Sequence, residues 1–373
     1  IILALSLETD LHSFHIGSPA IWYIFANILM FCMAFCSLSS VASDKMQSPD
    51  RFIGFFSNVV VSNKLNQLFF VWLIGYSAQI IIQDGFPLIW VLSEDPLTYV
   101  DFGIPTFGGG MNMLRAFLAC GFFMCWCAMK KIRYIFLCLF LIFSAAGLEM
   151  SRGNSMFLGL HLLFVYFFVH KFTFPRLFKL FLLSVMVVGI FGILGFLRHG
   201  RGFEILQGVN SGVIGSGTAS GIFASLIVPF KNYASLPLMN LDLKIQAAPL
   251  ASFIPYWTFQ PMFPTIIRDL IYAPSDYGFL ISDAHNVSTT FDGPIRDFGV
   301  LLSLPLMFCV YFTVSYFFLK ARLGNLFFFL CMPPLYASTV LSVFSNYFFI
   351  LSTILYPILV YLFLKVVSKR VPY

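Results

Sequence analysis

The sequence predicts an all-α polytopic integral membrane protein, and three observations lead to that fold class. The composition is apolar, with a mean hydropathy of +0.89, 59% hydrophobic residues and only 10% charged residues. Apolar runs of about 20 residues, the length that crosses a bilayer, recur along the chain. The connections between them alternate in charge, so the net charge of +6 comes from one set of connections and indicates no nucleic-acid partner.

The charge pattern also predicts the topology. One set of connections holds 14 of the 22 basic residues and only two acids, Asp44 and Asp50. By the positive-inside rule these connections are cytoplasmic, and the acid-rich connections face outward. The cytoplasmic basic residues are Lys45, Arg51, Lys64, Lys130, Lys131, Arg133, Lys171, Arg176, Lys179, Lys320, Arg322, Lys365, Lys369 and Arg370.

About ten transmembrane helices follow from the apolar runs. Residues 1–7 are interpreted as the end of a truncated first span. The other spans are predicted at 20–42, 65–83, 111–129, 132–149, 154–170, 177–197, 297–319, 325–344 and 346–365. The chain then divides into an N-terminal transmembrane bundle over 1–197 with an outward loop at 84–110, a large outward loop or cap over 198–296, and C-terminal transmembrane helices over 297–373.

No pattern in the chain predicts a cofactor or a metal. The glycine-rich run 208–221 follows no strand and precedes no Walker lysine, so a hinge or lid is favoured over a phosphate loop. The histidines have no metal-ligand spacing. The eight cysteines lie inside apolar runs, which favours packed thiols over disulfides.

Eight basic residues lie on the acidic side, and six of them are arginine. Arginine is preferred where phosphate or carboxylate is bound by two parallel hydrogen bonds, so these side chains could line a pocket for a pyrophosphate at headgroup depth. The alternative is that they extend to the interface and pair with Glu149, Glu204 or Asp297. The pocket candidates are Arg115, Arg152, Arg198, Arg201, Arg268 and Arg296.

Candidates for a catalytic base lie in the same outward segments. They are His199, His285 and Asp297, with Asp276, Asp283 and Asp292 as alternatives. Each histidine alone has a surface hydrogen-bonding role as its alternative. Asn286 follows His285 in the densest polar run, and Tyr256 and Trp257 could stack on sugar faces or belong to an interfacial aromatic belt.

Several short motifs give the chain a resemblance to a known family. They are DFGIPTFGGG at 101–110, SRGN at 151–154, LRHGR at 197–201 and HNVSTTFDGPIRDFG at 285–299. In this order and topology they resemble the Wzy-type O-antigen polymerases, the oligosaccharide repeat-unit polymerases of bacteria. The resemblance covers essentially the whole chain. Ser288-Thr289 stand where the family pattern often has Tyr-Thr, which leaves no aromatic role at 288.

The resemblance implies a GT-C-like, metal-independent glycosyltransferase of lipopolysaccharide biosynthesis. Such an enzyme lies in the bacterial inner membrane with its active site facing the periplasm. It transfers a growing chain from undecaprenyl pyrophosphate to a new lipid-linked unit, and a chain-length regulator is a further expected partner beside membrane lipid.

Two other functions stay open at this point. An O-antigen ligase shares the donor and the topology but transfers to lipid A core. A transporter or flippase of the lipid-linked sugar would place ionisable residues near mid-span and often shows internal repeats, and neither is evident here. A membrane scaffold without catalysis is the remaining alternative.

Overall fold

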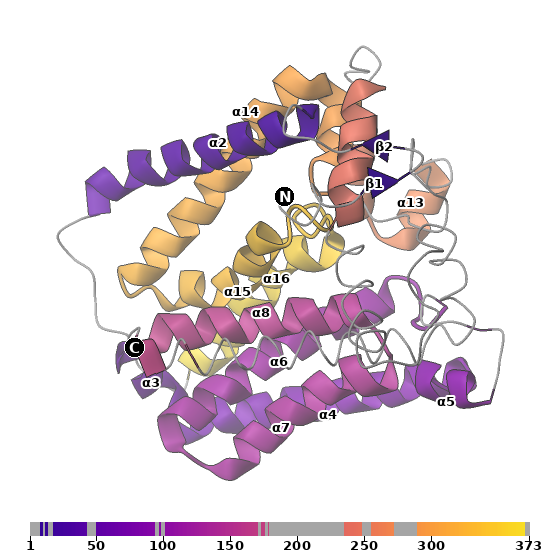
Figure 1. Cartoon of the computed structure of the whole chain (residues 1–373). Coiled ribbons are helices and arrows are strands. Elements are labelled where there is room, and N and C mark those ends of the chain that lie inside the picture. Colours follow the sequence, from indigo (N-terminus) through magenta and orange to yellow (C-terminus); the bar gives the residue numbers. More distant parts are fainter. Residues whose placement is uncertain are drawn as a thin grey trace.

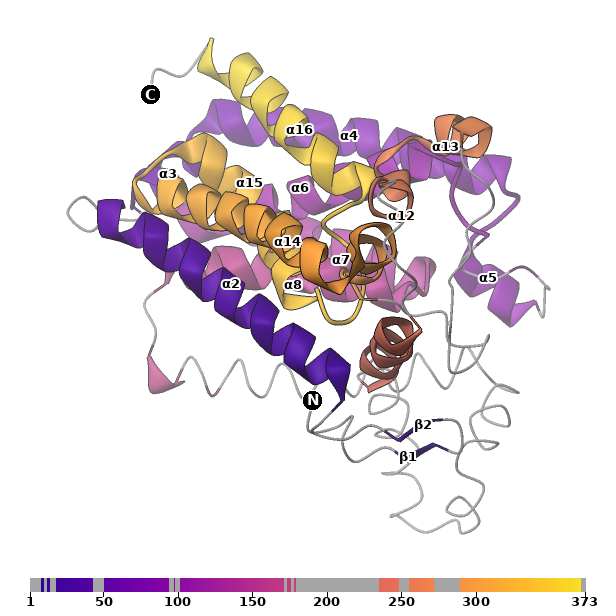
Figure 2. The same cartoon turned by 90° about the horizontal axis from the view of Figure 1, so that it is seen from above.

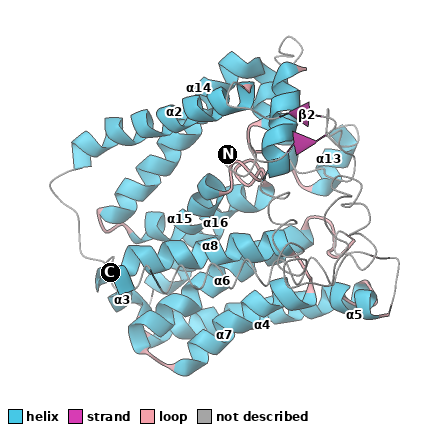
Figure 3. Cartoon of the chain, viewed as in Figure 1, coloured by secondary structure: helices cyan, strands magenta, loops and turns pink. Residues whose placement is uncertain are grey.

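The computed structural model describes the residues 8–9, 12–13, 18–42, 50–93, 97, 101–170, 173–175, 178, 235–247, 255–271 and 289–369. These parts are helical except for turns and one antiparallel pair of two-residue strands, β1 (Glu8–Thr9) and β2 (His12–Ser13), which the sequence did not predict (Figure 3). The stump 1–7, the predicted span 177–197 and much of the loop 198–296 lie outside the described residues.

The helices follow the predicted apolar runs closely. Their bounds are α2 (Pro19–Ala42), α3 (Asp50–Phe56), α4 (Val59–Ile82), α5 (Pro87–Leu92), α6 (Phe107–Met129), α7 (Ile132–Phe143), the π-helix η1 (Ser144–Leu148), α8 (Arg152–Val169), a helix over 235–246, α12 (Tyr256–Phe259), the 3-10 helix η2 (Gln260–Met262), α13 (Thr265–Ile271), α14 (Asp292–Arg322), α15 (Leu326–Val340) and α16 (Leu351–Ser368).

The protein is a multi-pass membrane protein. Within the described ranges, five stretches are long and apolar enough to cross a bilayer: Pro19–Ser39, Val59–Leu92, Phe107–Met129, Asp292–Arg322 and Leu351–Ser368. Large apolar side chains are exposed on these helices, as with Phe25 (64%) and Ile74 (71%), which suits a surface solvated by lipid. The total of ten spans stays a prediction.

Three spans begin at least four residues earlier than their hydropathy indicated, and one of them is α4, which begins at Val59. Helix α6 begins at Phe107, so the glycines 108–110 belong to its first turn, and α14 begins at Asp292. Hydropathy marks where the apolar run starts, whereas the backbone of α6 is already helical at Phe107 and the glycines, and α14 has a helical segment before its break at Gly299. An acid in the first turn, such as Asp292, favours a helix start because it faces the positive end of the helix dipole.

Three groups of helices pack side by side (Figures 1 and 2). In the first group α2 lies along α14. In the second group α8 packs against α15, and α15 also contacts α16. Helices α4, α6 and α7 form the third group. The α2–α14 contact carries polar groups inside the membrane region: the hydroxyls of Tyr23 and Ser303 are 2.7 Å apart, and the Tyr311 hydroxyl donates to Asn27 Oδ1 at 3.4 Å. Such interhelical hydrogen bonds join helices where lipid supplies no hydrophobic drive.

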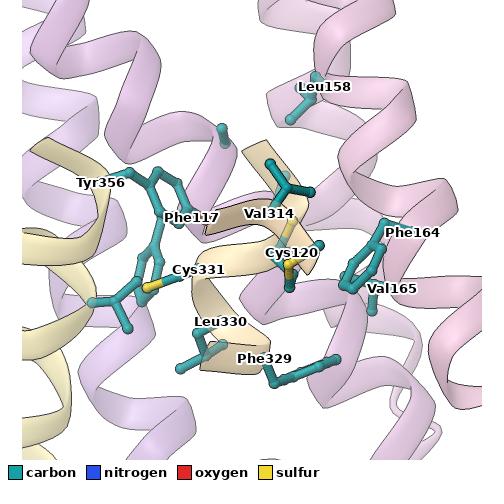
Figure 4. Packing of buried hydrophobic residues seen from close by; sticks show 14 of the residues in the cluster. Phe117, Cys120, Leu158, Phe164, Val165, Val314, Phe329, Leu330, Cys331 and Tyr356 are labelled. Carbon is teal, nitrogen blue, oxygen red and sulfur yellow. The ribbon is translucent and has the colours of Figure 1, made fainter. Parts of the chain in front are cut away.

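The core lies where α6, α8, α15 and α16 meet. Phe117, Phe164, Phe329 and Tyr356 are buried there with the thiols Cys120 and Cys331 (Figure 4). Phe52 of α3 stacks on Phe329 with ring centroids 4.4 Å apart. These contacts fix the axes of the bundle and thereby the positions of the helix ends.

The two ends of the bundle carry opposite charges. Helix α3 and the C-terminus lie at one end, which we call the inner end, and α5 and α13 lie at the other, the outer end (Figures 1 and 2). Inner-end connections carry Lys130, Lys131 and Lys369, whereas Glu149 and Asp297 belong to the outer end. The described helices therefore keep the charge sorting seen in the sequence. Which end faces the cytoplasm stays a prediction.

Candidate functional site

The outer ends of α6 and α8 are preceded by irregular backbone. Thr106, just before α6, has φ 67° and ψ −49°, and Met150, just before α8, has φ 49°. Residues other than glycine rarely adopt positive φ, and such strain of about 1–3 kcal/mol each collects at functional sites. Helix α7 continues into the π-helix η1, another irregularity that is frequent at such sites. The backbone thus points to these three helix ends.

A bidentate ion pair is buried below these turns. Arg115 of α6 donates from Nη1 to Glu149 Oε1 at 2.6 Å and from Nη2 to Oε2 at 2.9 Å. The guanidinium also donates to Ser144 Oγ at 3.3 Å and to Asn112 Oδ1. The two charged side chains are only 3% and 8% exposed. The planar guanidinium therefore holds the carboxylate in one orientation.

For Arg115 this geometry decides between the two alternatives drawn from the sequence. The side chain is the buried partner of Glu149, as the second alternative had it. Its guanidinium does not belong to the cavity wall described next. The pyrophosphate role predicted for Arg115 is not supported by this arrangement, because its donors already face a carboxylate and two side-chain oxygens.

A cavity of ≈ 230 Å³ opens beside the ion pair, and we call it the outer cavity. It lies among the turn before α6, the first turns of α6 and α8, and the end of α4. Its wall consists of Gln79, Phe102, Gly103, Ile104, Pro105, Thr106, Gly108, Gly109, Asn112, Glu149, Ser151 and Asn154.

The polar wall of the outer cavity combines amides, hydroxyls and one carboxylate. Gln79, Asn112 and Asn154 offer both donors and acceptors, and an ionised Glu149 offers acceptors only. No basic side chain belongs to this wall, as far as the described residues show. The set complements a neutral group with several hydroxyls better than it complements a phosphate.

Asp297, a predicted catalytic base, has a different setting. It is completely buried, and its Oδ1 and Oδ2 accept the backbone N–H groups of Trp257 at 3.0 Å and Thr258 at 2.7 Å. These N–H groups lie at the start of α12, where a helix has no internal acceptors for them. The geometry gives Asp297 a positioning role: it fixes α12 on the outer end of α14.

The rest of the run GPIRDFG (293–299) serves the same contact. A Cβ on Gly293 would lie 2.9 Å from Trp257 O and from Thr258 Cα, so only glycine lets α12 approach this closely. The Arg296 guanidinium lies 3.6 Å from the centroid of the Trp257 ring, and Tyr256 meets the same indole edge-on at 4.8 Å. One face of Trp257, a predicted sugar-stacking residue, is thus covered by Arg296.

The segment 255–271 connects this contact to the outer cavity. At its α12 end it is bound to Asp297, and the N–H of Thr265, which opens α13, donates to Thr106 Oγ1 at 3.0 Å. Between these points Phe259 packs edge-on against Phe349. We call this segment the outer strap. It runs from α14 to the cavity wall and carries Arg268, which is partly exposed on α13.

Several predicted site residues cannot be placed. His199, His285, Arg198, Arg201 and Asn286 lie outside the described residues. Arg152 begins α8, but its side chain is not among the described parts. Their roles stay predictions. Of the residues that can be placed, Arg296, Asp297, Tyr256 and Trp257 come together at the strap's anchor, and Arg115 lies apart with Glu149.

The sequence analysis missed the amides of the outer cavity and named Glu149 only as an ion-pair partner. Gln79 lies within an apolar span and is 2% exposed, which is unusual for an amide in a membrane helix. The presence of a polar amide inside an apolar span was the signal available in the sequence, since a polar residue inside a span faces the bundle or a cavity. Asn112 follows a glycine-rich turn and Asn154 follows Ser151, Arg152 and Gly153, and neither carried a comparable signal.

Comparison with protein-family models, with curated proteins and with solved structures finds no match for this chain. Among the described residues no group of three or more His, Cys, Asp or Glu side chains could hold a metal ion.

Proposed function

We propose that this chain is a membrane glycosyltransferase that polymerises lipid-linked oligosaccharide repeat units at the outer end of its helices. The observation that carries the proposal is the outer cavity, a pocket lined by amides, hydroxyls and one carboxylate at the end of a membrane bundle. A sugar attached to a lipid presents its hydroxyls at this depth while its tail stays in the bilayer. The order of the sequence motifs, which resembles the Wzy-type polymerases, supports the same class.

The reaction needs an attacking hydroxyl and a departing pyrophosphate. The acceptor oxygen forms a bond to the anomeric carbon of the donor sugar, the bond from that carbon to the pyrophosphate oxygen breaks, and the hydroxyl proton passes to a base. Glu149, whose orientation is fixed by Arg115, joins His199 and His285 as a candidate that holds the acceptor hydroxyl or takes its proton.

The leaving group calls for positive charge that Arg115 does not supply in this arrangement. Arg268 on the outer strap and Arg296 at its anchor are candidates for that task, and Arg152, Arg198 and Arg201 are the further candidates. Arginines neutralise the charge that develops on a departing pyrophosphate without a metal.

The test is complementation of a strain that lacks this gene, with lipopolysaccharide read as a ladder on a gel. Gln79→Ala should shorten the ladder and leave more core carrying one repeat unit, while wild type restores the full ladder. Gln67→Ala is the matched control, because Gln67 is an exposed amide at the inner part of the same helix α4. Membrane levels of both variants are compared on a blot.

Each outcome of this experiment separates two functions. A ladder that the deletion leaves intact would exclude a polymerase. Bare core together with long lipid-linked chains would indicate a ligase, and loss of lipid-linked units from the outer leaflet would indicate a transporter.

A further inference from the structure

A second cavity, of ≈ 570 Å³, lies at the opposite end of the bundle and has no part in the proposed function. It is bounded by Arg51 on α3, the turn 323–325 between α14 and α15, the first residues of α15, and the last turns of α16. We call it the inner groove. In Figures 1 and 2 these elements lie at the end that carries α3 and the C-terminus.

The polar part of the inner groove is positively charged. Arg51 and Lys365 belong to its wall together with Asn325 and Ser368, and no acidic side chain lines it among the residues the structure describes. The start of α15 adds the positive end of a helix dipole on the same side. Two cations, an amide and a hydroxyl in one groove form a set of groups that binds a phosphate.

The remaining wall of the groove is apolar and continues onto the outside of the bundle. Leu326, Phe327 and Leu364 line it, and Tyr361, 56% exposed, joins it to the outer face of α16. On that face Ile358 and Leu362 are 54% and 53% exposed, as expected for contact with acyl chains. A soluble anion would gain nothing from this apolar surface, whereas a lipid would use both parts.

We propose that the inner groove binds the headgroup of an anionic phospholipid, with Arg51 and Lys365 on its phosphate and an acyl chain along α16. Basic pockets between membrane helices on the positive side of a protein bind such headgroups. The site would hold α3, the α14–α15 turn and the end of α16 together at one membrane surface.

The proposal is tested by native mass spectrometry of the purified full chain with dioleoylphosphatidylglycerol or dioleoylphosphatidylcholine. We expect wild type to prefer the anionic lipid by roughly 30-fold, the effect of two basic side chains near a membrane surface. Arg51→Gln with Lys365→Gln should remove the preference. Lys64→Gln with Lys130→Gln, an equal loss of charge outside the groove, should retain it.

Two further arms decide the remaining outcomes. Millimolar inorganic phosphate should leave the bound lipid in place; displacement would show a site for soluble phosphate and overturn the proposal, as would a preference that survives in the Arg51 and Lys365 variant. If that variant fails to fold, the proposal is tested by chemical acylation of lysine side chains in the wild-type protein. Phosphatidylglycerol should protect Lys365 and leave Lys64 reactive, and equal labelling of both would overturn the proposal.

Discussion

Two buried carboxylates at the outer end, Asp297 and Glu149, both accept two N–H groups but have different surroundings. Asp297 is enclosed by protein and accepts two backbone N–H groups. Glu149 accepts two N–H groups from one guanidinium and also borders a cavity. Hydrogen-bond partners alone therefore do not separate a structural acid from a functional one. Access to a ligand-sized space is the difference on which the proposed role of Glu149 rests.

The largest expected effect comes from removing the enclosed carboxylate. Asp297→Ala leaves the N–H groups of Trp257 and Thr258 buried without an acceptor, which should lower the free energy of unfolding by roughly 2–6 kcal/mol. Asp297→Asn, which keeps one acceptor, should lose about half as much. Thermal unfolding of the purified protein measures this, with the exposed Asp84→Asn as control. An Asp297→Asn variant that is as stable as wild type but inactive would indicate that Asp297 takes part in the reaction.

The ion pair provides a sharper test, because stability and activity should separate. Arg115→Met should destabilise the fold by about 3–5 kcal/mol, since it leaves Glu149 charged and buried. Adding Glu149→Leu should restore the unfolding temperature while repeat-unit polymerisation stays absent. The same unfolding assay and the lipopolysaccharide ladder report the two quantities. Recovery of the ladder in the double variant would show that polymerisation does not need Glu149.

A single cavity amide should affect binding and leave stability unchanged. Asn154→Ala removes one hydrogen-bonding group from the cavity wall, which should weaken use of the lipid-linked substrate roughly two- to tenfold. Initial polymerisation rates over a range of substrate concentrations in proteoliposomes measure it. Asn63→Ala, an exposed asparagine at the inner part of α4 and outside the cavity, is the control. Equal effects of the two variants would count against a sugar in the outer cavity.

The smallest effect is expected at the far attachment of the outer strap. Thr106→Val removes the hydroxyl that accepts the Thr265 N–H, worth about 0.5–1.5 kcal/mol, whereas Thr106→Ser keeps it. Hydrogen exchange of the amides in α13 should rise in the valine variant alone. Unchanged exchange would mean that the strap is held by other contacts.

The sequence predicted the fold better than the site for a physical reason. Apolar runs such as those around Trp72 and Phe117 are forced into helices because a bilayer leaves backbone groups no other partners. Helix ends were less certain, as at Asp292, where a polar helical segment precedes the apolar run and is separated from it by the non-helical Gly299. The cavity depends on how α4, α6 and α8 meet, so no local pattern revealed that Gln79 and Asn154 share its wall.

Gly299 has a consequence for anyone who scans this protein by saturation mutagenesis. Its φ of 72° and ψ of 174° break α14 in a conformation that is essentially confined to glycine. Every substitution there would introduce strain and score as loss of function, although the residue contributes no side chain. Gly293 would score in the same way because of its close approach to α12. A scan would thus highlight 293–299 as the most sensitive stretch for architectural reasons, and only assays that count folded molecules would direct attention to Gln79 and Glu149.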